Sequence, residues 1–168
     1  MKLLAPLFLC AAFGASGAAS AHVVLEYQVA PADAPYKATF KIGHGCGESP
    51  TRQVSVLVPP GVTGAKPMPK AGWAVEVQRG TGNSATRVTW TARTAADMLP
   101  NDQYDEFVVV ARTPKEPGTI YWPVHQVCES GRTDWVEVPR DGRKLSDLKS
   151  PAAALEVLPA DHGGGHRH

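Results

Sequence analysis

The sequence lacks a segment long enough to span a membrane and a surface suited to nucleic acid. Its N-terminal apolar run covers only residues 3–13 and is followed by Gly14 and Gly17, so it is too short to cross a bilayer. Positive and negative charges are nearly balanced, with 17 lysines and arginines against 16 acidic residues, and no basic cluster stands out. We therefore expect neither nucleic-acid binding nor attachment to anionic lipid.

Motifs of common enzyme classes are also missing. The chain has no Gly-x-Ser-x-Gly, no His-Glu-x-x-His and no phosphate-binding glycine loop of the Walker type. The 3.6-residue periodicity of amphipathic helices is not evident before the C-terminal region. The sequence therefore gives no motif that indicates a hydrolase or a Walker-type nucleotide-binding enzyme.

The first 21 residues have the composition of an export signal. Lys2 supplies the positive charge, residues 3–13 the apolar stretch, and Ala19-Ser20-Ala21 the small-x-small cleavage site. We predict that residues 1–21 are a signal peptide cleaved after Ala21, and that the mature protein is exported to the periplasm.

Cysteine is scarce, with three residues in the chain. Cys10 lies in the predicted signal peptide, which leaves Cys46 and Cys128 in the mature protein. An even pair in an exported chain is most simply one disulfide. A metal-bound thiolate pair is the alternative.

From residue 22 onward, short alternating segments are separated by proline and glycine, as in a sheet protein. The predicted strands cover residues 22–29, 36–42, 53–58, 72–77, 86–92, 106–112, 119–124 and 133–138. About eight strands at regular spacing predict an immunoglobulin-like β-sandwich over residues 22–158, with a closed barrel as the alternative. Residues 145–158 fit either a short helix or a last strand, and residues 159–168 are predicted to be a flexible His-rich tail.

His22 becomes the first residue if cleavage follows Ala21. Its α-amino nitrogen and ring Nδ1 can then chelate one metal ion in a six-membered ring. One further nitrogen would complete a T-shaped set of three, which suits Cu(II), the ion at the top of the divalent affinity order. The reference pKa of a terminal amine, about 7.7, lets a metal displace its proton near neutral pH.

His44 is the candidate for the further nitrogen. Its neighbours Gly43 and Gly45 permit a sharp turn and close approach of another segment. The strand before it is expected to run antiparallel to a neighbour, which can bring its end, with His44, near the N-terminus. The alternative is a histidine that satisfies hydrogen bonds of its own turn. His125 lies in a strand segment and is interpreted as a packed or hydrogen-bonded residue.

Short motifs along the mature chain resemble those of the YcnI-like copper-binding domains of exported bacterial proteins. They are His22-Val23-Val24, Phe40-Lys41-Ile42-Gly43-His44-Gly45-Cys46, Ser49-Pro50-Thr51, Val56-x-Val58-Pro59-x-Gly61-Val62, Pro69-x-x-Gly72-Trp73, Val88-Thr89-Trp90, Phe107-x-Val109 and Trp135. The resemblance covers nearly the whole mature domain in order. It implies an immunoglobulin-like sandwich that binds Cu(II) through a histidine brace at its processed N-terminus.

The resemblance also implies a tryptophan close to the metal, which Trp135 matches, and a glutamate ligand that this chain does not match. His44 is our candidate to replace the glutamate, with Glu48 as the weaker candidate. Family members are linked to copper uptake and homeostasis, so the expected partners are other periplasmic copper carriers or a copper-importing membrane protein.

The end of the chain holds further candidate ligands, His162, His166 and His168, which could collect metal loosely. We predict an exported copper-binding protein that traffics or stores Cu(II) and is not an enzyme. The alternatives are a copper-dependent redox enzyme and an adhesion-type sandwich without a metal.

Overall fold

The computed structural model describes residues 22–160, which form β-strands joined by loops and short 3₁₀ turns. The strands are β1 (Val24–Leu25), β2 (Val29–Pro31), β3 (Pro35–Ile42), β4 (Thr51–Leu57), β5 (Thr63–Pro67), β6 (Trp73–Arg79), β7 (Ala85–Ala92), β8 (Asp105–Arg112), β9 (Gly118–Trp122), β10 (Val124–Cys128), β11 (Arg132–Trp135) and β12 (Ala153–Leu158). The 3₁₀ turns are η1 (Thr81–Asn83), η2 (Ala95–Asp97) and η3 (Leu145–Asp147).

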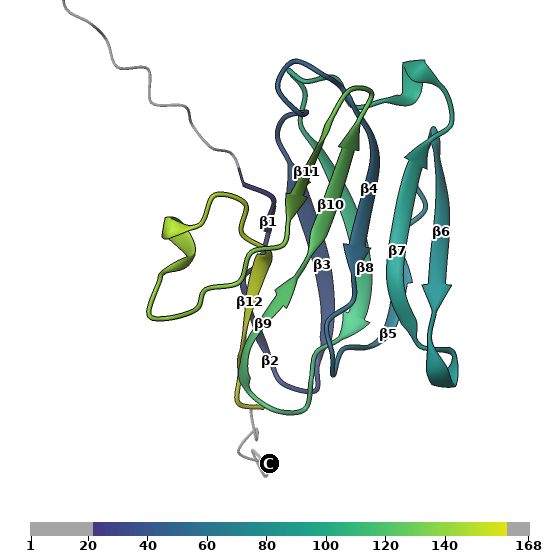
Figure 1. Cartoon of the computed structure of the whole chain (residues 1–168). Helices are drawn as coiled ribbons and strands as arrows, with labels where there is room; N and C mark the ends of the chain where they lie inside the picture. The colour runs from purple at the N-terminus through teal and green to yellow at the C-terminus, as the bar shows by residue number, and fades with distance from the viewer. Residues whose placement is uncertain (1–21, 161–168) are drawn as a thin grey trace, which may run out of the picture.

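Two larger sheets pack face to face, and a third, smaller sheet lies beside them (Figure 1). The strand order is β1-β3-β8-β5 in the first, β11-β10-β4-β7-β6 in the second, and β2-β12-β9 in the third. β9 leads directly into β10 with only Pro123 between them, so this stretch passes from the small sheet to the five-stranded one. The predicted β-sandwich is confirmed, and the closed barrel is wrong because the described sheets end in free edges.

Several strand predictions need correction. Residues 22–29 do not form a single strand, because the chain bends at Glu26. Before the bend β1 pairs with β3, and after the bend β2 pairs with β12. The segment with Pro67, which lies outside the predicted strands, contains the edge strand β5. An edge position tolerates proline because the missing N–H does not interrupt a ladder on both sides.

The later predictions are corrected in the same way. Pro123 divides the segment predicted as one strand over residues 119–124, so that β10 starts at Val124 and runs to Cys128. The ambiguous segment 145–158 contains both the 3₁₀ turn η3 and the last strand β12. The alternation of apolar and polar residues therefore did not predict most of β10 and did not distinguish β12 from a helix.

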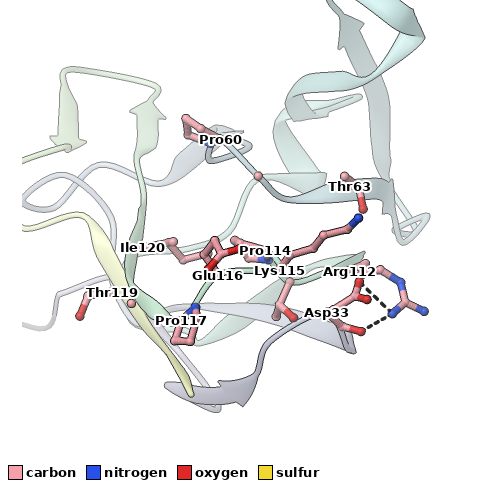
Figure 2. A pocket seen from close by; sticks show the side chains of 13 residues that line it. Asp33, Pro60, Thr63, Arg112, Pro114, Lys115, Glu116, Pro117, Thr119 and Ile120 are labelled. Atoms are coloured by element: carbon pink, nitrogen blue, oxygen red, sulfur yellow. Dashed lines mark hydrogen bonds and ion pairs between the residues drawn. The ribbon is translucent and has the colours of Figure 1, made fainter. Parts of the chain in front are cut away.

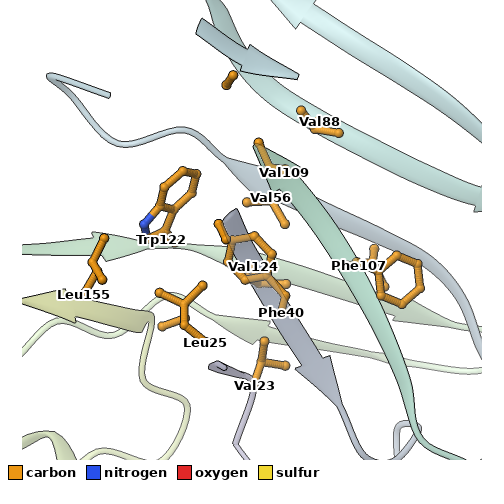
Figure 3. Close-up of a cluster of buried hydrophobic side chains, with 14 of the residues drawn as sticks. Val23, Leu25, Phe40, Val56, Val88, Phe107, Val109, Trp122, Val124 and Leu155 are labelled. Atoms are coloured by element: carbon orange, nitrogen blue, oxygen red, sulfur yellow. The ribbon is translucent and has the colours of Figure 1, made fainter. Parts of the chain in front are cut away.

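Side chains from the facing sheets fill the core (Figure 3). Phe40 and Trp122 pack edge to face with ring centroids 5.6 Å apart, and Trp90 packs against Phe107 at 5.5 Å. Complete burial of a large apolar side chain stabilises the folded state by about 1.5–3 kcal/mol. Core packing therefore accounts for Trp90 and Trp122, whereas the buried Trp135 also contacts residues at the N-terminal end of the domain.

Candidate functional site

Two histidines far apart in the sequence meet at one tryptophan. The rings of His22 and His44 lie edge-on to the ring of Trp135, with centroid distances of 5.9 and 6.0 Å. Trp135 ends β11 and is 3% exposed, while both histidines are half-buried. The start of β1 lies next to β11 in Figure 1.

The pairing of β1 with β3 explains this meeting. The two strands are antiparallel, and Val24 pairs with Lys41. The same register, continued by two residues, brings His22 level with Gly43, the residue before His44. The neighbour that the sequence did not identify is therefore β1, and this antiparallel pairing brings the end of β3 to the start of the domain.

The ring of His44 has a defined tautomer. Its Nδ1 lies 2.6 Å from the carbonyl oxygen of Gly45. A carbonyl oxygen can only accept, so Nδ1 carries the proton and the lone pair of the neutral ring is on Nε2. His44 thus forms a hydrogen bond within its own turn, and Nε2 is the atom that it can offer to a metal ion.

The turn that carries His44 is tied to the protein at several points. The backbone N–H of Gly45 donates to Asn101 Oδ1 at 2.9 Å. Cys46 forms the predicted disulfide with Cys128, with an S–S distance of 2.04 Å. The disulfide is confirmed, and it excludes the metal-thiolate interpretation because both sulfur atoms are bonded to each other.

Gly45 allows this turn to close. A Cβ atom at this position would lie 1.9 Å from the carbonyl oxygen of Ser49, far inside van der Waals contact. That oxygen accepts the N–H of Cys46 at 3.1 Å, so it belongs to the turn itself. The close approach of another segment, inferred from the glycines of the sequence, is present as well, because the same Cβ would lie 3.3 Å from Asn101 Oδ1.

We predict that Gly45→Ala lowers the free energy of unfolding by about 1–3 kcal/mol, because the added methyl group must push the Ser49 backbone away. Denaturant unfolding measures this change. Gly80→Ala is the matched control, because a Cβ there meets only the Thr86 side chain, at 2.9 Å, and should cost less. Equal losses in the two variants would contradict the close-approach explanation.

Glu48 does not join the two histidines. It is exposed and lines a separate hollow with Pro50 and with several residues of the 95–102 segment, among them Met98 and Asp102. Within residues 22–160, no three His, Cys, Asp or Glu side chains come together as a set of metal ligands. The structure therefore brings together two imidazoles and one indole, and any third donor must come from elsewhere.

His125 lies on the opposite face of β10 from Trp135 and its neighbours. Its Nδ1 is 2.6 Å from Asp134 Oδ1, and Arg132 binds the other carboxylate oxygen. The hydrogen bond from His125, with a smaller contribution from Arg132, holds the pKa of Asp134 below its usual range. His125 is thus a hydrogen-bonded surface residue, in agreement with its interpretation from the sequence.

Sequence reasoning missed Gln126, which supports the Trp135 ring. The indole N–H donates to Gln126 Oε1 at 3.0 Å, and Gln126 is 1% exposed. A signal was present, because the two-residue period of β10 places Gln126 on the same buried face as Val124 and Cys128. A polar residue on such a face must have internal partners.

A separate hollow of about 730 Å³ lies at the other end of β3, away from His44 (Figure 2). Pro60, Pro114 and Ile120 supply apolar surface, and Arg112 pairs with Asp33 at its rim. No histidine or cysteine lines this hollow, so we do not assign the candidate metal site to it.

Three of the predicted features lie outside the described residues: the signal peptide 1–21, its cleavage site, and the tail with His162, His166 and His168. Among residues 22–160, no helix is long and apolar enough to cross a membrane.

Comparison with known proteins supports the fold. Residues 22–157 match the family described as a domain of unknown function (DUF1775). The chain is similar to an uncharacterized protein from Nocardia farcinica described as having an immunoglobulin-like fold, with 25% identity, a TM-score of 0.71, and coverage of 81% of this chain and 97% of that chain. A putative membrane anchored protein from Corynebacterium diphtheriae is 12% identical, with a TM-score of 0.46 over 82% of this chain and 34% of that chain. No curated protein matches the chain. The predicted immunoglobulin-like fold is confirmed.

Proposed function

The chain belongs to the DUF1775 family of domains of unknown function, and from its own residues we propose that it is an exported protein that binds Cu(II) and carries or stores it. The observation that supports this proposal is the meeting of His22 and His44 at the Trp135 ring. Cleavage after Ala21 would place a free amine on His22, beside these two imidazoles.

The donor atoms fit Cu(II) better than the other common ions. Two imidazoles and one amine are three nitrogen donors, and tetragonal nitrogen sites favour Cu(II). Structural zinc sites use four tetrahedral ligands, and soft Cu(I) favours thiolates, but both described cysteines are in the disulfide. A brace of this kind needs only two side chains, because its third donor is the terminal amine.

The surroundings favour a carrier over a catalyst. The Trp135 ring packs against both imidazoles and would cover one side of a copper ion held between them. The Cys46–Cys128 disulfide is typical of proteins that work in oxidising compartments such as the periplasm. We propose that the ion is exchanged with other periplasmic copper carriers or with a copper-importing membrane protein.

Titration with Cu(II) in the presence of a competing chelator tests the proposal. The parent protein should start at His22 and end at Ala160, so that the histidines of the tail do not contribute. We expect tight binding that is weakened strongly by His22→Ala and by His44→Ala, and unchanged by His125→Ala, since His125 lies outside the site. Equal affinity in the parent and in His22→Ala would refute the proposal, and sustained oxygen consumption with a reductant would assign a redox enzyme instead.

A further inference from the structure

Gln126 joins three groups around the candidate copper site. It lies in β10 and is 1% exposed. Its Oε1 accepts the indole N–H of Trp135 at 3.0 Å, and its Nε2 donates to the His44 carbonyl oxygen at 2.6 Å and to Thr51 Oγ1 at 2.7 Å. One buried side chain thus contacts both the tryptophan and the segment that carries the second histidine.

The orientation of the Gln126 amide follows from its partners. The indole N–H of Trp135 can only donate, and the His44 carbonyl can only accept. A flipped amide would set two donors against each other at Trp135 and two acceptors against each other at His44. The arrangement also uses both N–H groups and the oxygen of the amide, so each polar group of this buried side chain has a partner.

The network constrains the geometry in which the two imidazoles meet. Gln126 holds the backbone of His44 and the plane of the Trp135 ring in a fixed relation, and both imidazoles form T-shaped contacts with that ring. We infer that Gln126 is a positioning residue for the copper site, which it shapes without contacting the ion. This inference rests on the proposed function and adds to it the residue that orients the ligands.

Gln126→Leu tests the inference, because leucine fills similar space but offers no hydrogen bond. We expect Cu(II) affinity to fall about 10- to 100-fold, the range seen when outer-shell partners of metal ligands are removed. The Cu(II) electron paramagnetic resonance spectrum should change as well, and in the metal-free protein the indole N–H resonance of Trp135 should shift. Gln53→Leu is the matched control, because Gln53 lies on the neighbouring strand β4 and bonds only to Thr91 on the outer face.

A second variant covers the case in which Gln126→Leu does not fold. Gln126→Asn keeps a buried amide but is one methylene shorter, so it cannot reach Trp135 and His44 together, and it should give a smaller change of the same kind. Parent-like affinity and spectrum in a folded Gln126 variant would overturn the positioning role while leaving copper binding intact. Absence of Cu(II) binding in the parent protein would instead contradict the proposed function, and the positioning role at a copper site would fail with it.

Discussion

Replacement of both Cys46 and Cys128 by serine is expected to lower the free energy of unfolding by about 4 kcal/mol. The disulfide joins residues 82 positions apart, and the loop-entropy model assigns a stabilisation of this size to a loop of that length. The physical reason is that the crosslink limits the conformations open to the unfolded chain, which therefore gains less entropy on unfolding. Since domains are stable by about 5–15 kcal/mol, this loss is a large part of the total.

Urea unfolding of the parent and of the double variant measures this effect. The parent unfolded under reducing conditions should approach the stability of the double variant, which separates loss of the crosslink from effects of serine. A change below about 1 kcal/mol would contradict the expectation. The free energy of Cu(II) binding should change less than the free energy of unfolding. Hydrogen bonds from Gln126 to the His44 carbonyl and from the Gly45 N–H to Asn101 still hold the His44 turn.

Acetylation of the α-amino group of His22 is expected to weaken Cu(II) binding by about 100-fold or more. The amide that forms can no longer donate a lone pair, so the chelate of amine and imidazole is lost. Removal of a group that hydrogen-bonds to a metal ligand already lowers metal affinity by about 10- to 100-fold. Loss of a direct ligand should lower the affinity at least as much. This result would separate a histidine brace from a site made of two imidazoles alone.

The difference between the reference pKa values of a terminal amine, about 7.7, and of lysine, about 10.4, permits selective acetylation near neutral pH. Mass spectrometry should confirm one added acetyl group and a parent chain that begins at His22. Thermal unfolding of the metal-free protein serves as the control for the fold. An unchanged affinity would show that the amine is not a ligand, and an exported protein that retains residues before His22 would contradict the predicted brace.

The positions of most strands follow from local sequence. Alternation of apolar and polar residues reflects the two-residue period of a strand, so segments such as 36–42 and 86–92 could be recognised without knowledge of their partners. The disulfide could be predicted because only two cysteines, Cys46 and Cys128, lie outside the predicted signal peptide. The edge strand β5 could not be predicted, since a short segment with Gly64 and Pro67 becomes a strand only through its pairing with β8.

The candidate site was only partly accessible from the sequence. His22 and His44 could be proposed because a predicted cleavage site and a glycine turn are local features. Their meeting at Trp135 depends on the register of β1 with β3 and on the packing of β11, which tertiary structure alone decides. The same is true of Gln126, whose three partners come from strands and turns up to 82 positions away. Residue types therefore determined which atoms could bind copper, and long-range packing decided which of them lie together.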